Sequence, residues 1–209
     1  MFGAELLSKV HVTPNGIRPP TSEMPARARD RFLYVGTDRP HKNLLRLIEA
    51  YSIARRDESA LPPLEIIGGL RSEQLLREAM RRFGVEHGVR LRGHVSQEAL
   101  EASYAAAVAL VFPSLAEGFG LPILEAMVRG VPVITSNVSA CAEVAGEAAV
   151  TVDPLDARAI AAAMVKVWRS PELREALIEK GRTRAAEFTW ERTAGGTLRV
   201  IEECLSGRP

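Results

Sequence analysis

From residue 31 onward, the chain alternates short apolar runs with helical patterns. The apolar runs have the length of strands and lie at 32–35, 64–67, 89–91, 109–112, 131–134 and 149–152. Helical patterns separate them at 44–55, 72–83, 97–106 and 122–129. Strands that alternate with helices and are apolar on both faces form parallel sheets covered by helices. The order therefore predicts a doubly wound, Rossmann-like α/β domain with a mostly parallel sheet.

The two ends of the chain depart from this alternation. In the lead-in, residues 9–12 predict a short strand, Pro14-Asn15-Gly16 predicts a turn, and a polar passage follows to Asp30. In the tail, Asp156 and Ser170 are the expected N-caps of two helices, and Thr189 opens a last one. We expect a single domain with a helical tail, divided into a lead-in and linker at 1–30, the Rossmann-like domain at 31–188 and a C-terminal helix at 189–209.

Composition argues against several classes of protein. The formal net charge is +1 and aromatic residues are 5%, which disfavours general nucleic-acid binding and base-stacking platforms. No apolar stretch has the length of a signal peptide or a membrane span, so we expect a soluble, cytoplasmic protein, with loose peripheral membrane attachment left open. Cys141 and Cys204 lack zinc-site spacing and are expected to be buried thiols in a reduced compartment.

The most informative local stretch runs from Glu117 to Glu125. Two carboxylates stand at the ends of the sequence Glu-Gly-Phe-Gly-Leu-Pro-Ile-Leu-Glu. Gly118 and Gly120 allow a ligand close to the backbone, and Pro122 suits the first position of a helix. Free N–H groups at such a helix end favour phosphate, whereas carboxylates suit hydroxyl groups attached to it. The stretch therefore points to a sugar nucleotide; the alternative is a plain turn in which one acid favours the helix dipole and the other is solvated.

Two further loops are expected at the same edge, because ligands of open α/β sheets bind beyond the carboxyl ends of the strands. The loop 36–43 lacks GxGxxG, which disfavours a nicotinamide or flavin enzyme, and its Lys42 could supply a charge to a phosphate. In the loop 93–96, His94 could stack on a ring, and backbone groups could contact a base. Taken alone, Lys42 is typical of a solvated surface and His94 of a half-buried structural residue. Glu143 is interpreted as a further loop acid with a surface role.

Taken together, these motifs resemble those of one family. The strand sequences Phe-Leu-Tyr-Val-Gly (32–36) and Val-Phe-Pro-Ser (111–114), the Lys42-Asn43 pair, the glutamate-flanked stretch and Phe188-Thr189-Trp190 occur in a family-specific order. Their order and spacing are similar to those of the C-terminal, donor-binding domain of the retaining group-one glycosyltransferases, which are built from two Rossmann-like domains (the GT-B architecture). The resemblance covers residues from about 9 to 205.

The resemblance implies a role for each matching position. Glu117 would be the carboxylate at the catalytic centre, holding hydroxyl groups of the donor sugar, and Glu125 would accept hydrogen bonds from the ribose. Lys42 would neutralise the diphosphate, and the backbone around Val95 would contact the base. The diphosphate would bind the amides at the helix end, which belong to Gly118, Phe119, Gly120 and Leu121. Members of the family transfer the sugar with retention of configuration and use neither a metal ion nor a cofactor.

Two positions depart from the family pattern and leave the donor open. Many relatives place an arginine where this chain has Thr37, and a small residue with proline where it has Ala140-Cys141-Ala142. Relatives also carry an N-terminal, acceptor-binding domain of about this size. We therefore expect the chain to start within the segment that joins the two domains, to bind a nucleotide sugar and to transfer it negligibly without that domain.

The implied activity is the transfer of a hexose from a nucleoside-diphosphate sugar to a glycan or a lipid-linked acceptor. Lys42-Asn43 and residues 135–138 are similar in style to mannosyltransferases of polysaccharide assembly, which favours GDP-mannose over a UDP-sugar. Two alternatives stay open: a sugar-nucleotide epimerase of the same architecture, and a non-catalytic scaffold that binds nucleotide sugars. A phosphorylase is disfavoured because Lys166 and Lys180 lie in helical patterns away from the strand-end loops.

Overall fold

The computed structural model describes residues 10–20 and 29–206. Within these residues the sheet has six strands in the order β3-β2-β1-β4-β5-β6, and every neighbouring pair is parallel. The strands are β1 (Arg31–Val35), β2 (Leu64–Ile67), β3 (Val89–Arg92), β4 (Ala107–Phe112), β5 (Val133–Ser136) and β6 (Val150–Val152). The chain starts in the middle of the sheet, builds out to one edge and returns to build the other. The predicted fold class is confirmed.

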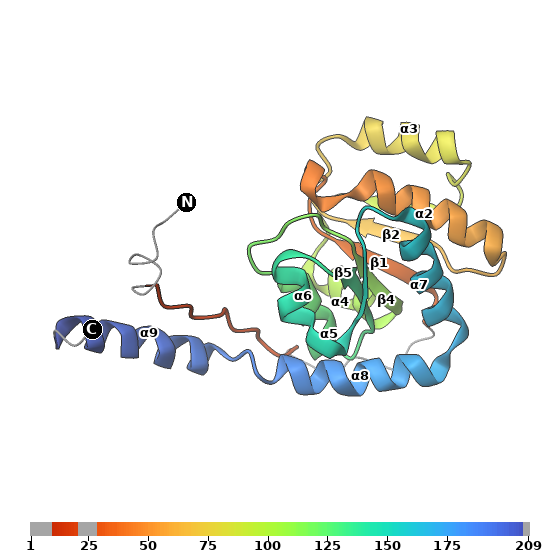
Figure 1. Cartoon of the computed structure of the whole chain (residues 1–209). Coiled ribbons are helices and arrows are strands. Elements are labelled where there is room, and N and C mark those ends of the chain that lie inside the picture. The colour runs from red at the N-terminus through yellow and green to blue at the C-terminus, as the bar shows by residue number, and fades with distance from the viewer. Residues whose placement is uncertain (1–9, 21–28, 207–209) are drawn as a thin grey trace.

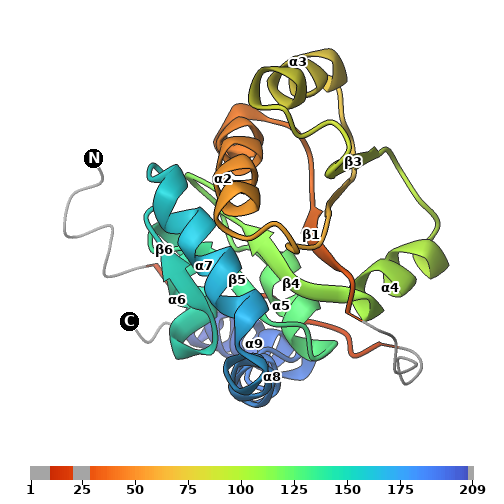
Figure 2. The same ribbon diagram turned by 90° about the vertical axis from the view of Figure 1, so that its right-hand side faces the viewer.

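Helices connect and flank the strands (Figure 1). They are η1 (Pro40–Lys42), α2 (Leu44–Asp57), α3 (Glu73–Phe83), α4 (Gln97–Ala105), α5 (Leu121–Val128), α6 (Ser139–Ala145), η2 (Gly146–Ala148), α7 (Ala157–Arg169), α8 (Pro171–Ala185) and α9 (Trp190–Leu205). Right-handed crossovers toward opposite edges place α2 and α3 on one face of the sheet and α4 and α5 on the other, as Figure 2 shows. Helix α7 packs on α2 and α8 packs on α5, which completes the two helical layers.

The centre of the sheet is buried on both faces. All six residues of β4 are buried, and so are Phe32, Leu33 and Tyr34 of β1. Full burial of a large apolar side chain contributes about 1.5–3 kcal/mol, so the two central strands supply a large part of the stability. The edge strand β3 differs, because Val89 is buried whereas its neighbour Arg90 is exposed.

Strands β1 and β4 are neighbours in the sheet although the chain leaves them toward opposite faces. The point where the strand order reverses is where open α/β sheets bind ligands. Here the loop after β1 and the loop after β4 touch, since the N–H of Leu115 donates to the carbonyl of His41 at 2.7 Å. The loops that the sequence singled out therefore share one edge of the molecule.

Residues 10–16 and α9 form an arm that projects from the body (residues 29–188), as Figure 1 shows. The arm is held where its two segments cross. The N–H of Ile17 donates to the carbonyl of Phe188 at 2.9 Å, and the hydroxyl of Thr193 donates to the carbonyl of Pro14 at 2.7 Å. A Cβ on Gly16 would lie 2.3 Å from the backbone nitrogen of Trp190, so the crossing requires a glycine.

The N-caps expected at Asp156 and Ser170 are confirmed, and Thr189, expected to open the last helix, caps it as well. Asp156 accepts the N–H groups of Arg158 and Ala159 at the start of α7, at 2.8 and 3.1 Å. At the start of α8 the Ser170 hydroxyl accepts the N–H of Leu173 at 3.1 Å, and at the start of α9 the Thr189 hydroxyl accepts the N–H of Arg192 at 3.2 Å. Such caps each contribute about 1 kcal/mol. Within 10–20 and 29–206, every helix falls short of the length or hydrophobicity that a bilayer crossing requires.

Several expectations about the ends of the chain are wrong in detail. Residue 9 lies outside the described structure, and residues 10–12 pair with no strand within it; Val10 and Val12 are exposed on the arm. No turn forms at residues 14–16, where the chain runs extended past α9. Cys141 is buried as expected, but Cys204 is exposed because it lies on α9.

The expected linker is anchored at its described end. The Arg29 guanidinium donates to the carbonyls of Ala107 and Gly130, at 2.9 and 2.8 Å, so this residue belongs to the body. The greater part of the polar passage, residues 21–28, lies outside the described residues.

Candidate active site

The candidate site is built around the N-terminus of α5. Gly120 caps this helix with φ at 96°, a conformation that a side chain would strain. Within the described chain no side chain caps this end, Pro122 has no N–H, and the Ile123 N–H donates to the Gly120 carbonyl at 3.0 Å. The Leu121 N–H is therefore the first-turn donor that stays available to a ligand. The helix starts at Leu121, which puts Pro122 at the second position rather than the predicted first. The predicted donors from Gly118 to Leu121 precede the proline and keep their N–H groups.

Lys42 and Glu117 meet in front of this helix end. Lys42 closes η1 after β1, and Glu117 lies in the loop after β4. Their Nζ and Oε1 atoms are 2.7 Å apart, and both side chains are largely buried, with 15% and 10% exposed. The same Nζ lies 5.1 Å from the centroid of the Phe112 ring. Two residues that the sequence singled out separately thus form one ion pair, partly withdrawn from water.

Two polar residues to which sequence reasoning assigned no role hold this pair in place. Asn43 donates through Nδ2 to the carbonyls of Pro113 and Pro154, at 3.0 and 2.7 Å, and ties together the loops after β1, β4 and β6. Its φ of 62° is left-handed, a region in which asparagine is enriched, so this residue type was a usable signal. The hydroxyl of Ser139 accepts the Glu117 N–H at 3.3 Å, and nothing in the sequence announces this contact.

Glu125 lies one turn inside α5 and has a different kind of partner. The phenol of Tyr104 donates to its Oε2 at 3.0 Å. Burial, and then the charge of Glu125, raises the pKa of Tyr104 well above its usual value, so the phenol stays protonated and acts as the donor. The structure therefore assigns a cation to Glu117 and a neutral group to Glu125, and the two carboxylates share no partner among the described residues.

The loop after β3 lies farther along the same edge. Val95 is half-buried against the core, and β2 and β1 separate its strand from β4. His94 is exposed, and a Cβ on Gly69 would lie 3.4 Å from its Nε2 and 3.8 Å from the Thr37 methyl. The segments that follow β1, β2 and β3 therefore lie close together here.

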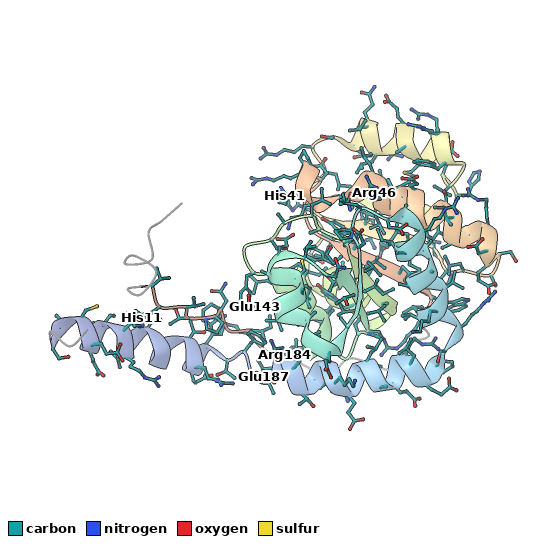
Figure 3. All side chains as sticks on the ribbon, viewed as in Figure 1. His11, His41, Arg46, Glu143, Arg184 and Glu187 are labelled. Atoms are coloured by element: carbon teal, nitrogen blue, oxygen red, sulfur yellow. The ribbon has the colours of Figure 1, made fainter. Side chains whose placement is uncertain are left out.

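Glu143 lies in α6, not in the loop that the sequence predicts. This helix is seven residues long and no side chain caps it within the described chain, so it leaves little local signal. Glu143 borders a hollow of about 740 Å³ at the root of the arm, which Gly118 and Phe119 also line. Figure 3 labels Glu143 beside Arg184 and Glu187 at this place. The helix end of the candidate site thus opens toward the arm.

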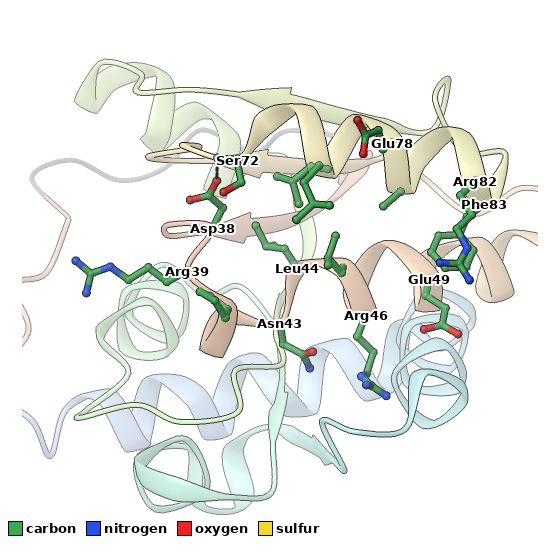
Figure 4. Close-up of a pocket in the computed structure, with 15 residues that line it drawn as sticks. Asp38, Arg39, Asn43, Leu44, Arg46, Glu49, Ser72, Glu78, Arg82 and Phe83 are labelled. Carbon is green, nitrogen blue, oxygen red and sulfur yellow. Dashed lines mark hydrogen bonds between the residues drawn. The ribbon is translucent and has the colours of Figure 1, made fainter.

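A second groove lies between α2 and α3 (Figure 4). It has a volume of about 670 Å³, and none of the predicted site residues lines it. At one end the Asp38 carboxylate accepts the N–H of Ser72. Acidic and basic groups balance along its length, with Asp38, Glu49 and Glu78 against Arg39, Arg46 and Arg82. Its walls show no preference for a charged ligand, and it adjoins the α5 site at Asn43.

Comparison with known proteins gives consistent results. The profile of the Glycosyl transferases group 1 family matches residues 25–184. The O-antigen chain mannosyltransferase B of Escherichia coli is 39% identical over 172 residues, which are 81% of this chain and 45% of that protein. This chain spans about half the length of the curated relatives it matches.

Solved structures share the fold at lower identity. TarM from S. aureus, in a complex that includes UDP, superposes with a TM-score of 0.82 at 16% identity, over 94% of this chain and 41% of that one. The C-terminal domain of a group 1 glycosyl transferase from Francisella tularensis gives a TM-score of 0.69 at 21% identity, over 81% of this chain and 93% of that domain. The chain belongs to the group 1 glycosyltransferase family, and its fold is that of the C-terminal domain.

Proposed function

We propose that this chain is the donor-binding domain of a retaining glycosyltransferase that transfers mannose from GDP-mannose to a glycan or lipid-linked acceptor. The observation that carries the proposal is the Lys42–Glu117 ion pair in front of the α5 N-terminus. It combines a cation, a carboxylate and free backbone donors at the point where the strand order reverses. The 39% identity to an O-antigen mannosyltransferase supports mannose as the sugar.

The diphosphate would bind at the α5 N-terminus. The amides from Gly118 to Leu121 and the positive end of the helix suit its oxygens, and the Lys42 ammonium, which is paired with Glu117 in the free chain, would donate a further hydrogen bond to them. When the bond to the sugar breaks, negative charge grows on the leaving diphosphate oxygen. Donors already in place there lower the barrier, because they need no reorganisation. This arrangement would favour departure of the nucleoside diphosphate, because it stabilises the negative charge on the leaving oxygen.

The two carboxylates would bind the two hydroxyl-bearing parts of the donor. Lys42 donates to Oε1 of Glu117, and the Ser139 hydroxyl accepts the backbone N–H of Glu117, so both the side chain and the backbone of this residue are held beside the diphosphate, where the sugar would lie. Glu125 would accept hydroxyl groups of the ribose. The backbone at Val95 would contact the base.

We propose further that the chain acts with a second domain. The acceptor site and the remaining catalytic groups would lie on an N-terminal domain. Residues 1–30 would join that domain to the body, and the C-terminal helix, 189–209, would pack on part of its surface. The body, 31–188, would bind the donor alone. Purified 1–209 should therefore transfer sugar negligibly, and acceptor glycosylation at a rate typical of enzymes would overturn this division of labour.

Binding of the donor nucleotide is tested by thermal unfolding with UDP, GDP, ADP and their sugar conjugates. A ligand that binds only the native state adds about 2.7 kcal/mol at 100 times its Kd. We expect the largest shift with GDP or GDP-mannose and its loss in Glu125→Ala. Glu175→Ala, an exposed glutamate on α8, is the matched control and should keep the shift.

Other outcomes separate the alternatives. A shift with uridine nucleotides only would replace GDP-mannose by a UDP-sugar and leave the site unchanged. A shift that survives in Glu125→Ala would contradict the role given to that carboxylate. Absence of any shift would contradict the proposal for this chain and favour a scaffold that binds no donor by itself.

A further inference from the structure

Tyr104 makes a contact that no role in the proposed function explains. It lies on α4, is fully buried, and donates its hydroxyl hydrogen to Oε2 of Glu125 at 3.0 Å. A buried phenol needs a partner, but a backbone carbonyl is the usual one. Here the partner is a half-buried carboxylate at the ligand-binding edge, so the hydrogen bond holds Oε2 of Glu125 from inside the protein.

Arg129 holds the Tyr104 ring in turn. Its guanidinium lies 4.9 Å from the ring centroid and pairs with the Glu101 carboxylate through Nε and Nη2, at 2.7 and 2.5 Å. Its Nη1 donates to the backbone carbonyl of Glu125 at 2.9 Å. The Arg129 hydrogen bonds lower the pKa of Glu101, so the pair stays charged at neutral pH. The Arg129 side chain thus packs against the Tyr104 ring and links α4 to α5.

A neutral donor orients Glu125 without cancelling its charge. Lys42 pairs with the Glu117 carboxylate, whereas the donor to the Glu125 carboxylate is an uncharged phenol. The Arg129 guanidinium donates to the backbone carbonyl of Glu125 and not to its carboxylate. Among the described residues no hydrogen bond reaches Oε1 of Glu125, so this oxygen remains for a ligand. A charged carboxylate with one oxygen tied and the other open suits a pair of adjacent hydroxyl groups.

We infer that Tyr104 is a positioning residue that holds Glu125 for the ribose hydroxyls, with Arg129 and Glu101 keeping its ring in place. This inference rests on the proposed function, because it takes the ribose as the ligand of Glu125. It adds a residue from a second helix to donor recognition, and it assigns a recognition role to the α4–α5 contact.

The test compares two ligands that differ only in the ribose. Affinities of chain 1–209 for GDP and for 2′,3′-dideoxy-GDP are measured by calorimetry, with UDP and its dideoxy analogue in parallel. The wild type should favour the hydroxylated nucleotide about tenfold or more, since hydrogen bonds to charged groups are strong. Tyr104→Phe should weaken the affinity for GDP about three- to tenfold and change the affinity for the dideoxy analogue by less than about twofold. Arg129→Gln should act in the same direction and more weakly.

Tyr51→Phe is the matched control, because the buried Tyr51 hydroxyl has no hydrogen-bond partner among the described residues. It should leave the ratio of the two affinities unchanged. A merely structural effect of Tyr104→Phe would weaken both ligands alike, and that result, or an unchanged ratio, would overturn the inference while leaving the proposed function intact. A wild type that binds neither nucleotide, or does not distinguish the pair, would overturn the ribose role of Glu125 and the inference with it.

Discussion

The body and the arm are stabilised in different ways. In the body, β4 is buried along its whole length between two helical layers. In the arm, α9 contains no buried residue, and Leu198 and Ile201 are 56% and 49% exposed. Its order depends on the Thr189 cap and on the crossing at Gly16. A helix with an apolar face needs a surface to cover that face, since packing supplies most helical stability in proteins. The comparison teaches that the body covers its own core, whereas the arm leaves the apolar residues of α9 exposed.

The sharpest test of this difference makes the same truncation in both regions. Leu110→Ala in β4 should lower the free energy of unfolding by about 2–5 kcal/mol, because it leaves a cavity in the core. Leu198→Ala in α9 should change it by less than about 0.5 kcal/mol. Denaturant unfolding of both variants measures the two values. A large cost for Leu198→Ala would show that α9 is covered in solution and would remove the contrast.

A smaller effect is expected from a buried charge in the body. Glu65 is 2% exposed on β2 and accepts hydrogen bonds from Arg31 and Arg92, at 3.2 and 3.1 Å. Burial by itself raises the pKa of Glu65, but the hydrogen bonds from Arg92 and Arg31 outweigh it, and the pKa is lowered. A lowered carboxyl pKa gives stability that is present above the unfolded value, about 4.3, and is lost as the pH falls through the folded value.

Glu65→Gln should therefore lower the free energy of unfolding by about 1–3 kcal/mol at pH 7. The gap to the wild type should close as the pH falls below about 4. Glu202→Gln, on exposed α9, is the control and should stay within about 0.5 kcal/mol of the wild type at each pH. An equal gap at pH 3 and pH 7 would show that the charge of Glu65 does not contribute.

The smallest effect concerns the crossing that holds the arm. Gly16→Ala should separate the two segments, because its Cβ would meet backbone atoms of Trp190 and Thr189 at 2.3 and 2.6 Å. Gly195→Ala has no atom within 4 Å of the added Cβ and should strengthen α9 by about 0.5–1 kcal/mol. Amide hydrogen exchange in α9 should become faster in the first variant and slower in the second, with the body unchanged. Equal protection of the α9 amides from exchange in the two variants would show that the crossing does not anchor this helix.

The strands of the body were predictable because the central ones are apolar on both faces. The clearest displacement is β5, expected at 131–134 and found at Val133–Ser136. Its last two residues are polar yet buried: Thr135 and Ser136 donate to the carbonyls of Phe112 and Ser114, at 2.8 and 2.6 Å. A hydrophobic pattern cannot count such residues as strand, since their partners lie on another segment.

The candidate site was predictable in its parts but not in its contacts. The glycine at the helix start, the lysine after the first strand and the two glutamates each carry a local signal. The partners do not: Lys42 and Glu117 are 75 positions apart, and Tyr104 and Glu125 are 21 apart. Short α6 and its Ser139 gave no pattern strong enough to predict, so the role of Ser139 emerged only from the structure.

The sequence by itself determined the order of the six strands and of the α-helices other than α6, the N-caps of the tail and the need for glycine at Gly120. These depend on backbone preferences and on interactions between near neighbours, which a short stretch of chain contains in full. Only the tertiary structure decided which charge each carboxylate meets, which cysteine is buried and that α9 lies exposed. These depend on contacts between distant segments, and their energies exist only after packing has removed the groups from water.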